Sequence, residues 1–314
     1  MFTTKVEIPE SPIKITHEDG IIALGSCFSE NIGQKMNDAG FNIAVNPFGV
    51  LYNPISIRNS LRFLLENKRF SAKDLFFDGS LWNSFAHSGL FSDINISTCL
   101  EKINLRLEKS SLQVSKMRFL FITFGTSWVF ENTENGEIVS NCHKIPAKNF
   151  IRYSLNVEKI VNDYRELIQR LNAKSPNLKI IFSVSPIRHW KDGAHENNLS
   201  KARLLLAINL LQNEFENVLY FPAYELLLDE LRDYRYYATD MLHLSETAIN
   251  YIWERFSDCY FSSETKKIKT EVEQLNADFA HRPLHPNSES YQKFLENIEE
   301  RKKKIVEKYP NLKI

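Results

Sequence analysis

Residues 21–27 read Ile-Ile-Ala-Leu-Gly-Ser-Cys, a short apolar run that stops abruptly at a glycine. A strand that is buried on both faces has this appearance. Ser29 can cap a following helix that ends at Gly40, and a second apolar run starts at Phe41. Strand, helix and strand in this order predict a right-handed parallel crossover, and therefore a sheet with helices on its faces.

The same alternation continues along the chain. We predict further strands at 119–124, 178–184 and 218–221, and helices at 55–66, 96–112, 157–171, 198–215, 225–231 and 245–260, with Asn198 or Ser200 capping the fourth of these. Five short strands that alternate with helices predict a doubly wound parallel sheet in a three-layer α/β/α domain. Apolar runs at 128–130 and 138–140 flank an Asn135-Gly136 turn signal, so we expect a β-hairpin inserted after the third strand.

The last part of the chain has a different pattern. Residues 1–261 account for the α/β domain, whereas residues 262–314 contain a helix, a proline-containing turn at 282–286 and a charged helix at 291–309. We expect a C-terminal helical appendage on the α/β domain. The basic run at 301–304 is interpreted as a solvated helix end, because glutamates precede it at near i,i+4 spacing.

Composition excludes several classes of function. Of the 314 residues, 39 are Lys or Arg and 39 are Asp or Glu, which disfavours nucleic acid or an anionic membrane as a partner. The four cysteines form no CxxC pair, and the eight histidines form no HxH or HExxH motif, so no metal and no cofactor are predicted. The absence of a signal-peptide pattern and of an 18-residue apolar run predicts a cytoplasmic protein.

Two parts of the sequence suggest nucleophilic catalysis. In a doubly wound sheet the ligand site lies beyond the carboxyl ends of the strands, and Ser26 follows the first strand at the start of a helix whose N–H groups can stabilise an oxyanion. Asp240 lies three residues before His243, just ahead of the last core helix. Asp240 can orient the imidazole while His243 accepts the proton of Ser26, as in a Ser-His-Asp triad.

Each half of this pattern has an alternative. A Gly-Ser dipeptide and a DxxH spacing are weak signals alone, and His243 can equally be a helix-capping or buried structural residue. The thiol of Cys27 is a second possible nucleophile, although a side chain at this position normally packs into the helix. Four further residues are candidates for substrate contacts or for buried residues that hold loops: His87, Ser88, Arg188 and His189.

A family resemblance is carried by Gly25-Ser26-Cys27-Phe28-Ser29. This run resembles the signature of the GSCFA family, a bacterial branch assigned to the SGNH (GDSL-like) hydrolases, except that Ser29 replaces the alanine of the family pattern. Further stretches resemble the same family in the same order: 46–49 (NPFG), 124–128 (FGTSW), 141–144 (NCHK), 185–189 (SPIRH) and 240–243 (DMLH).

The resemblance implies a flavodoxin-like SGNH fold and a serine esterase mechanism with Ser26 as nucleophile, His243 as base and Asp240 as its partner. The superfamily also takes oxyanion donors from a glycine after the second strand and from the asparagine of a GxND motif after the third. Gly49 or the side chain of Asn46 can supply the first donor. Ser127 occupies the position of that asparagine, so the candidates for the second donor are Thr126, Ser127, Asn141 and His143.

The function that we predict is hydrolysis of a short acyl ester of a sugar or other small polar metabolite through an acyl-enzyme, with that ester as the partner. Two alternatives remain open at the level of sequence. The missing GxND asparagine favours an SGNH-like binding or structural protein with weak catalysis. An acyltransferase would use the same triad with an acceptor other than water.

Overall fold

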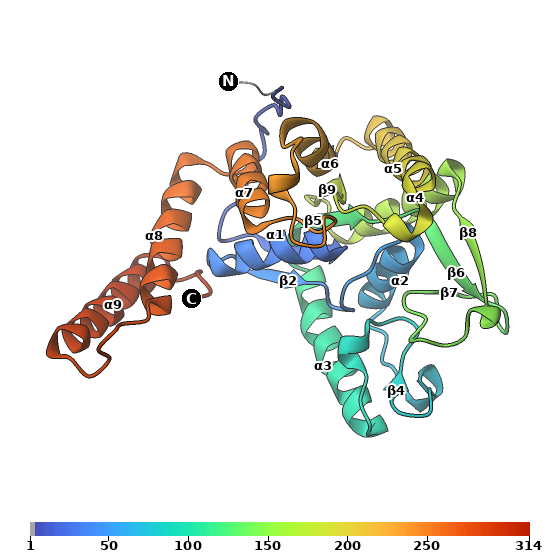
Figure 1. The fold of residues 1–314 in the computed structure, drawn as a ribbon, viewed down its shortest axis with the longest axis horizontal. Helices are drawn as coiled ribbons and strands as arrows, with labels where there is room; N and C mark the ends of the chain where they lie inside the picture. The colour runs from blue at the N-terminus through green and yellow to red at the C-terminus, as the bar shows by residue number, and fades with distance from the viewer. Residues whose placement is uncertain (1–3) are drawn as a thin grey trace.

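The computed structural model describes residues 4–314, and its centre is a parallel sheet of five strands (Figure 1). The strands are β1 (Gly20–Gly25), β2 (Ile43–Val45), β5 (Met117–Phe124), β9 (Lys179–Val184) and β10 (Val218–Tyr220). Their spatial order is β10-β9-β5-β1-β2, which is the flavodoxin-like order 2-1-3-4-5 when these five are numbered along the chain. The predicted doubly wound parallel sheet is confirmed.

The interior strand β1 shows why this sheet needs helices on both faces. All six of its residues are buried, and it pairs with β2 on one side and β5 on the other. Ile22 and Leu24 join the hydrophobic core on one face of the sheet, whereas Ile21 and Ala23 join the core on the other. Side chains of a strand alternate between faces, so a continuous apolar run can only be satisfied by two cores.

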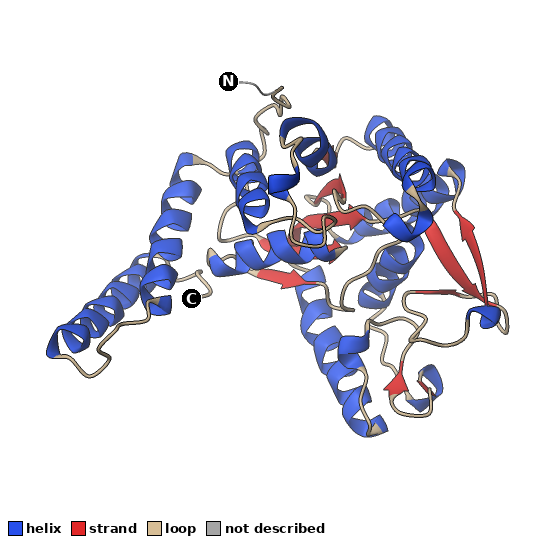
Figure 2. Cartoon of the chain, viewed as in Figure 1, coloured by secondary structure: helices blue, strands red, loops and turns tan. Residues whose placement is uncertain are grey.

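Helices cover both faces of the sheet (Figure 2). One core receives side chains from α2 (Pro54–Leu65), α3 (Ile96–Val114), α4 (Val157–Lys174) and α5 (Ala194–Glu214). The other core receives side chains from α1 (Cys27–Asp38), α6 (Ala223–Glu225) and α7 (Glu246–Tyr260). The two groups of helices are the outer layers of the predicted three-layer arrangement, and each core lies between one group and the sheet.

Two helix starts differ from the prediction. Helix α1 begins at Cys27 rather than after Ser29, because Ser26 has extended backbone angles and its carbonyl accepts the N–H of Glu30. Helix α5 begins at Ala194, earlier than the predicted caps Asn198 and Ser200, because Gly193 has a φ of +78° and takes the N-cap position. The predicted helix at 225–231 is the short α6 followed by a π-helical turn at Leu226–Glu230.

The insertion after β5 is larger than predicted. The hairpin of β6 (Trp128–Asn132) and β7 (Ile138–Val139) is present, and a third strand, β8 (Phe150–Ser154), pairs with β6. The sequence of β8 carries no alternating signal, because only Phe150 is buried while the next three residues are exposed. Strands β3 (Phe76–Phe77) and β4 (Trp82–Asn83) form a small hairpin within the aromatic stretch.

The C-terminal part consists of α8 (Ser263–Ala280) and α9 (Glu289–Lys308), which project from one side of the molecule (Figure 1). Val272, Leu275 and Ile298 form a small core between them. The chain end then returns to the α/β part, where the N–H of Lys313 donates to the carbonyl of Gly40 at 3.1 Å. Within residues 4–314, no helix has the length and apolar character needed to span a membrane.

Candidate active site

Ser26 lies between β1 and α1, at the point where the strand order of the sheet reverses. Gly25 makes this position possible, since its φ is +142° and a Cβ there would lie 2.2 Å from the carbonyl oxygen of Thr123 on β5. Ser26 is only 2% exposed, and its Oγ has no hydrogen-bond partner within residues 4–314. The hydroxyl is thus held, uncommitted, at the positive end of the α1 dipole.

Asn46 follows β2 and places its side chain against Gly25. Its Oδ1 accepts the N–H of Gly25 at 3.0 Å, and its φ of +42° is in the left-handed region that asparagine tolerates. Its Nδ2 is buried and has no partner among the described residues. The N–H of Gly49, by contrast, already donates to the carbonyl of Asn46 at 2.8 Å. Of the two candidates for the first oxyanion donor, the side-chain amide of Asn46 is therefore the one with a free N–H.

Asp240 and His243 form a close pair in the loop before α7. The Nδ1 of His243 lies 2.6 Å from Oδ2 of Asp240, while Oδ1 of Asp240 accepts the backbone N–H groups of Leu242 and His243 at 2.9 Å each. The bond to the imidazole, followed by these backbone bonds, lowers the pKa of Asp240 to about 2. An ionised Asp240 makes Nδ1 the protonated nitrogen, which leaves Nε2 as a proton acceptor.

The structure does not join Ser26 to His243. No hydrogen bond connects the two side chains in the part of the chain that is described, and the side chain of His243 is 53% exposed. The backbone of the His243 loop is closed by a 2.7 Å bond from the N–H of Ala238 to the carbonyl of His243. The predicted base and its carboxylate are thus paired with each other, but the predicted nucleophile Ser26 is not paired with them.

The loop after β5 uses its donors internally. The N–H groups of Gly125 and Thr126 both donate to the carbonyl of Tyr52, at 2.7 and 3.0 Å. The N–H of Ser127 donates to Ser200 Oγ at 2.8 Å, and the Ser127 hydroxyl bonds Ser154 Oγ at 2.7 Å. Thr126 Oγ1 also lies 3.1 Å from Ser200 Oγ. These bonds attach the loop to α5 and β8, so the predicted candidates Thr126 and Ser127 have their donors engaged.

Asn141 and His143 organise the aromatic stretch at residues 70–91. Asn141 accepts the N–H of His143, and Nε2 of His143 lies 2.8 Å from the carbonyl oxygen of Ser84 and 3.1 Å from that of His87. His87 is fully buried and stacks on Phe48, and burial lowers the pKa of His87 to about 3. These contacts place Asn141, His143 and His87 in loop packing.

The sequence predicts that Cys27 packs into the helix, but in the structure its side chain is only partly buried. Its Sγ lies 3.5 Å from the hydroxyl of Tyr52, because the early start of α1 turns Cys27 away from the buried face that Phe28 occupies. The rings of Tyr52 and His189 are in edge-on contact, with their centroids 5.3 Å apart. A Cβ on Gly125 would lie 3.3 Å from Nε2 of His189. Burial, followed by the charge of Lys201, lowers the pKa of His189 to about 4.

Lys201 on α5 joins the ends of two strands. Its buried Nζ donates to the carbonyls of Gly125 and Ser185, both at 2.7 Å, and to that of Ile187 at 3.0 Å. Three acceptors require all three N–H donors, so this geometry belongs to the ammonium form, even though burial lowers the pKa of Lys201 to about 7. The sequence contains a signal for this burial, since Lys201 shares the apolar face of α5 with Leu204 and Ile208.

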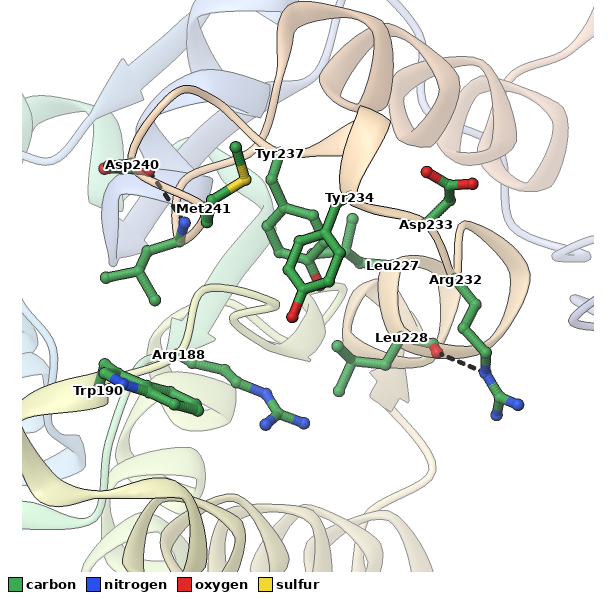
Figure 3. Close-up of a pocket in the computed structure, with 11 residues that line it drawn as sticks. Arg188, Trp190, Leu227, Leu228, Arg232, Asp233, Tyr234, Tyr237, Asp240 and Met241 are labelled. Atoms are coloured by element: carbon green, nitrogen blue, oxygen red, sulfur yellow. Dashed lines mark hydrogen bonds between the residues drawn. The ribbon is translucent and has the colours of Figure 1, made fainter.

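A pocket of about 550 Å³ adjoins the loop that carries Asp240 (Figure 3). Its walls come from the loop after β9, the π-helical turn and the segment before α7. They include Arg188, Trp190, Tyr234, Tyr237, Asp240 and Met241. Within residues 4–314, no three His, Cys, Asp or Glu side chains are grouped so that they could hold a metal ion.

This architecture defines the class of the protein: a doubly wound α/β protein with a polar site on the loops that follow its strands. The GSCFA family matches residues 20–256, and the C-terminal domain of the GSCFA domain protein matches residues 272–314. The chain belongs to the GSCFA family.

The chain is also similar to two solved structures. One, from Streptococcus pneumonia, is described as a candidate platelet activating factor; it is 14% identical, with 76% of this chain and 84% of that chain covered and a TM-score of 0.37. The other is a Clostridium thermocellum family 3 carbohydrate esterase, 13% identical, with 81% and 98% covered and a TM-score of 0.33. Comparison with curated protein sequences gives no significant match.

Proposed function

We propose that this protein is a serine-dependent acyl hydrolase that acts on a short acyl ester of a sugar or other small polar metabolite. The observation that carries the proposal is the hydroxyl of Ser26, which is buried at the N-terminus of α1 without a partner in the described chain. Buried hydroxyl groups are usually hydrogen-bonded, so an unbonded one needs an explanation. A nucleophile that waits for its substrate is such an explanation.

The proposed reaction proceeds in two steps. Ser26 Oγ attacks the carbonyl carbon of the ester while its proton passes to Nε2 of His243, and the alcohol then departs with that proton, leaving acyl-Ser26. Water attacks the acyl carbon, gives a proton to His243 and releases the carboxylic acid as the proton returns to Ser26 Oγ. Asp240 remains ionised throughout and holds the imidazole.

The oxyanion formed in each step needs donors. The Nδ2 of Asn46 is a buried N–H donor with no partner in residues 4–314, and its amide is bonded to the residue directly before Ser26. The first-turn N–H groups of α1 add to it, because they have no intrahelical acceptor. This arrangement uses the side chain of Asn46, after β2, where the superfamily pattern has a glycine.

The proposal also requires a movement. His243 must bring Nε2 within hydrogen-bond distance of Ser26 Oγ, and catalytic hydrogen bonds often form only once substrate is bound. The loop that carries His243 is exposed, whereas Ser26 is held by the sheet. We therefore assign the movement to residues 238–243.

A fluorophosphonate probe together with p-nitrophenyl acetate tests this proposal. We expect the wild type to be labelled and to release p-nitrophenol, and Ser26→Ala to lose both. Ser29→Ala is the matched control, because Ser29 carries another buried hydroxyl on α1 without a partner among the described residues. An unlabelled wild type, or equal labelling of Ser26→Ala, would contradict the proposal.

The same assay separates the alternatives. If Cys27→Ala loses labelling while Ser26→Ala keeps it, the nucleophile is the thiol beside Tyr52 and the proposal for Ser26 is wrong. If an added alcohol accelerates turnover and appears as its ester among the products, the acyl-enzyme is intercepted by acceptors and the activity is transfer rather than hydrolysis.

A further inference from the structure

The pocket beside Asp240 has the size of a small-molecule site. Its volume of about 550 Å³ lies within the roughly 300–1,000 Å³ range of ligand pockets. Three residues of its wall, Asp240, Met241 and Leu242, belong to the loop that carries the proposed base, so a ligand here would contact that loop. The opposite wall comes from Leu227 and Leu228 on the π-helical turn.

Four charged side chains line the pocket, and three of them are paired. Asp240 bonds His243, Asp233 bonds Arg235 at 2.8 Å, and Arg232 bonds Asp229 at 3.2 Å. The fourth is Arg188, for which no carboxylate partner is present among residues 4–314. The pocket wall therefore contains one guanidinium without a direct carboxylate partner, while Asp240, bonded to an imidazole, contributes a carboxylate to the same wall.

Arg188 lies among phenols and a buried lysine, without a direct carboxylate partner in residues 4–314. Figure 3 shows the Arg188 guanidinium extending into the space below Tyr234 and beside Leu228. Its charge acts on the phenols of Tyr224 and Tyr237 and on Lys201, and with burial it lowers the pKa of Lys201. Lys201 bonds only neutral carbonyls, so neither this lysine nor Arg188 has a direct carboxylate partner among residues 4–314. A bound anion would supply the Arg188 guanidinium with such a partner.

Exposed aromatic rings flank the guanidinium. Trp190 is 53% exposed and Tyr234 is 73% exposed, and both line the pocket. In Figure 3 the Trp190 ring lies beside the Arg188 side chain and the Tyr234 ring lies above its guanidinium. Large rings exposed around a pocket are typical of ligand sites, and a flat ring can pack against the C–H face of a sugar.

We propose that this pocket binds the alcohol portion of the substrate, and that this portion is a sugar-like ring with an anionic group held by Arg188. The anionic group is a carboxylate or a phosphate, because both match the paired N–H donors of a guanidinium. That the ligand is an ester rests on the proposed function, whereas the binding of the anionic ring does not.

Binding measurements test the site without turnover. Isothermal titration of the full chain with methyl glucuronide, glucose 6-phosphate and methyl glucoside compares a carboxylate, a phosphate and a neutral ring. We expect one anionic ligand to bind at least about tenfold more tightly than the glucoside, the scale of a charge-assisted hydrogen bond. The tighter of the two anions identifies the group.

Two variants locate the effect. Arg188→Gln is expected to remove the preference for the anion. Arg235→Gln is the control, because Arg235 lies next to the pocket residue Tyr234, is paired with Asp233 and does not itself line the pocket. If Arg188→Gln fails to fold, the wild-type preference must still weaken as salt is raised from 20 to 500 mM NaCl, by roughly tenfold for an exposed ion pair. Equal binding of all three ligands, or a preference that survives Arg188→Gln, would overturn the inference.

Acetyl esters of the same three compounds connect the pocket to catalysis. Acetate release that favours the anionic ester by at least tenfold, through a lower KM, supports the site as the substrate pocket. Anion binding without any acetate release would leave the inference standing and the proposed function wrong. Acetate release with equal kcat/KM for all three esters would support the proposed function and show that the inference about the pocket is wrong.

Discussion

The side-chain oxygen of Asn46 accepts the backbone N–H of Gly25 at 3.0 Å. This bond, to the residue directly before Ser26, fixes the orientation of the side-chain amide. The amide nitrogen Nδ2 is then a buried donor with no partner in the described residues. The amide thus connects the ends of two neighbouring strands, β1 and β2. The proposed reaction requires Nδ2 of Asn46 to donate a hydrogen bond to the oxyanion.

Asn46→Asp and Asn46→Ala should both lower kcat by roughly 10²–10³-fold, the usual effect of removing one oxyanion donor. Aspartate keeps an acceptor for the Gly25 N–H and tolerates a φ of +42°, whereas alanine loses both advantages. Steady-state kinetics with p-nitrophenyl acetate measure the effect, and thermal melting measures stability separately. A kcat close to wild type in Asn46→Asp would rule out the amide as a donor.

Asp240→Asn should reduce kcat by at least tenfold and by up to about 10⁴-fold, because a neutral amide no longer enforces the imidazole tautomer that exposes Nε2. With a pKa of about 2, Asp240 stays ionised at any pH above roughly 4, so its own protonation will not produce the acidic limb of a pH–rate profile. Asp258→Asn removes an exposed carboxylate that pairs with Lys266 and should leave kcat unchanged. Similar kcat values in the two variants would exclude Asp240 from the triad.

Lys201→Met should lower the free energy of unfolding by about 2–4 kcal/mol. The three carbonyls that Lys201 bonds would lose a buried donor at roughly 1–3 kcal/mol each, partly offset by removing a buried charge. Urea unfolding measures the change, and Lys174→Met is the control, since Lys174 is exposed and makes one 3.3 Å bond. Equal stability of the two variants would show that the three bonds contribute nothing net.

The stability of the protein should fall as the pH drops below about 6.5, in part because of His87. The pKa of His87 is about 3 in the folded state and 6.5 in the reference state, so between these values the unfolded chain binds more protons and stability decreases with acid. The loss from this one residue is about 2 kcal/mol between pH 7 and pH 5.

His87→Phe should flatten this pH dependence by that amount, because phenylalanine keeps the stacking on Phe48 without a titrating group. Urea unfolding at pH 5, 6 and 7 gives the slope. His195→Phe, at an exposed position, should leave the slope as it is in the wild type. An unchanged slope in His87→Phe would mean that His87 does not titrate differently in the two states.

The sheet was predictable because its strands are buried on both faces. Runs such as residues 21–24 and 119–124 can only be satisfied between two helical layers, and the flavodoxin-like order agrees with the family resemblance. Strand β8 was not predictable, because it pairs at an exposed sheet and only Phe150 is buried. The start of α1 was misplaced because Ser29 is as good a cap by type as Ser26, and only the contact of Gly25 with Thr123 sets the turn.

In the candidate site, too, some residues were predictable from the sequence and others were not. Asp240 and His243 are three residues apart, so local geometry was enough to predict their pairing. Tyr52 carried no signal, because its carbonyl meets Gly125 and its hydroxyl meets Cys27 only in the folded chain. Lys201 could have been found from its place on the apolar face of α5, but its three acceptors could not.

The sequence by itself determined the parallel sheet, the position of Ser26 after its first strand and the Asp240–His243 pair, because each depends on residues that are close along the chain or on burial of apolar runs. Only the tertiary structure decided which donors are free. Hydrogen bonds across the fold engage Thr126 and Ser127, a local turn engages the N–H of Gly49, and Nδ2 of Asn46 is left without a partner in residues 4–314. The physical reason is that a polar group acts on a substrate only when no neighbour in the fold has already satisfied it.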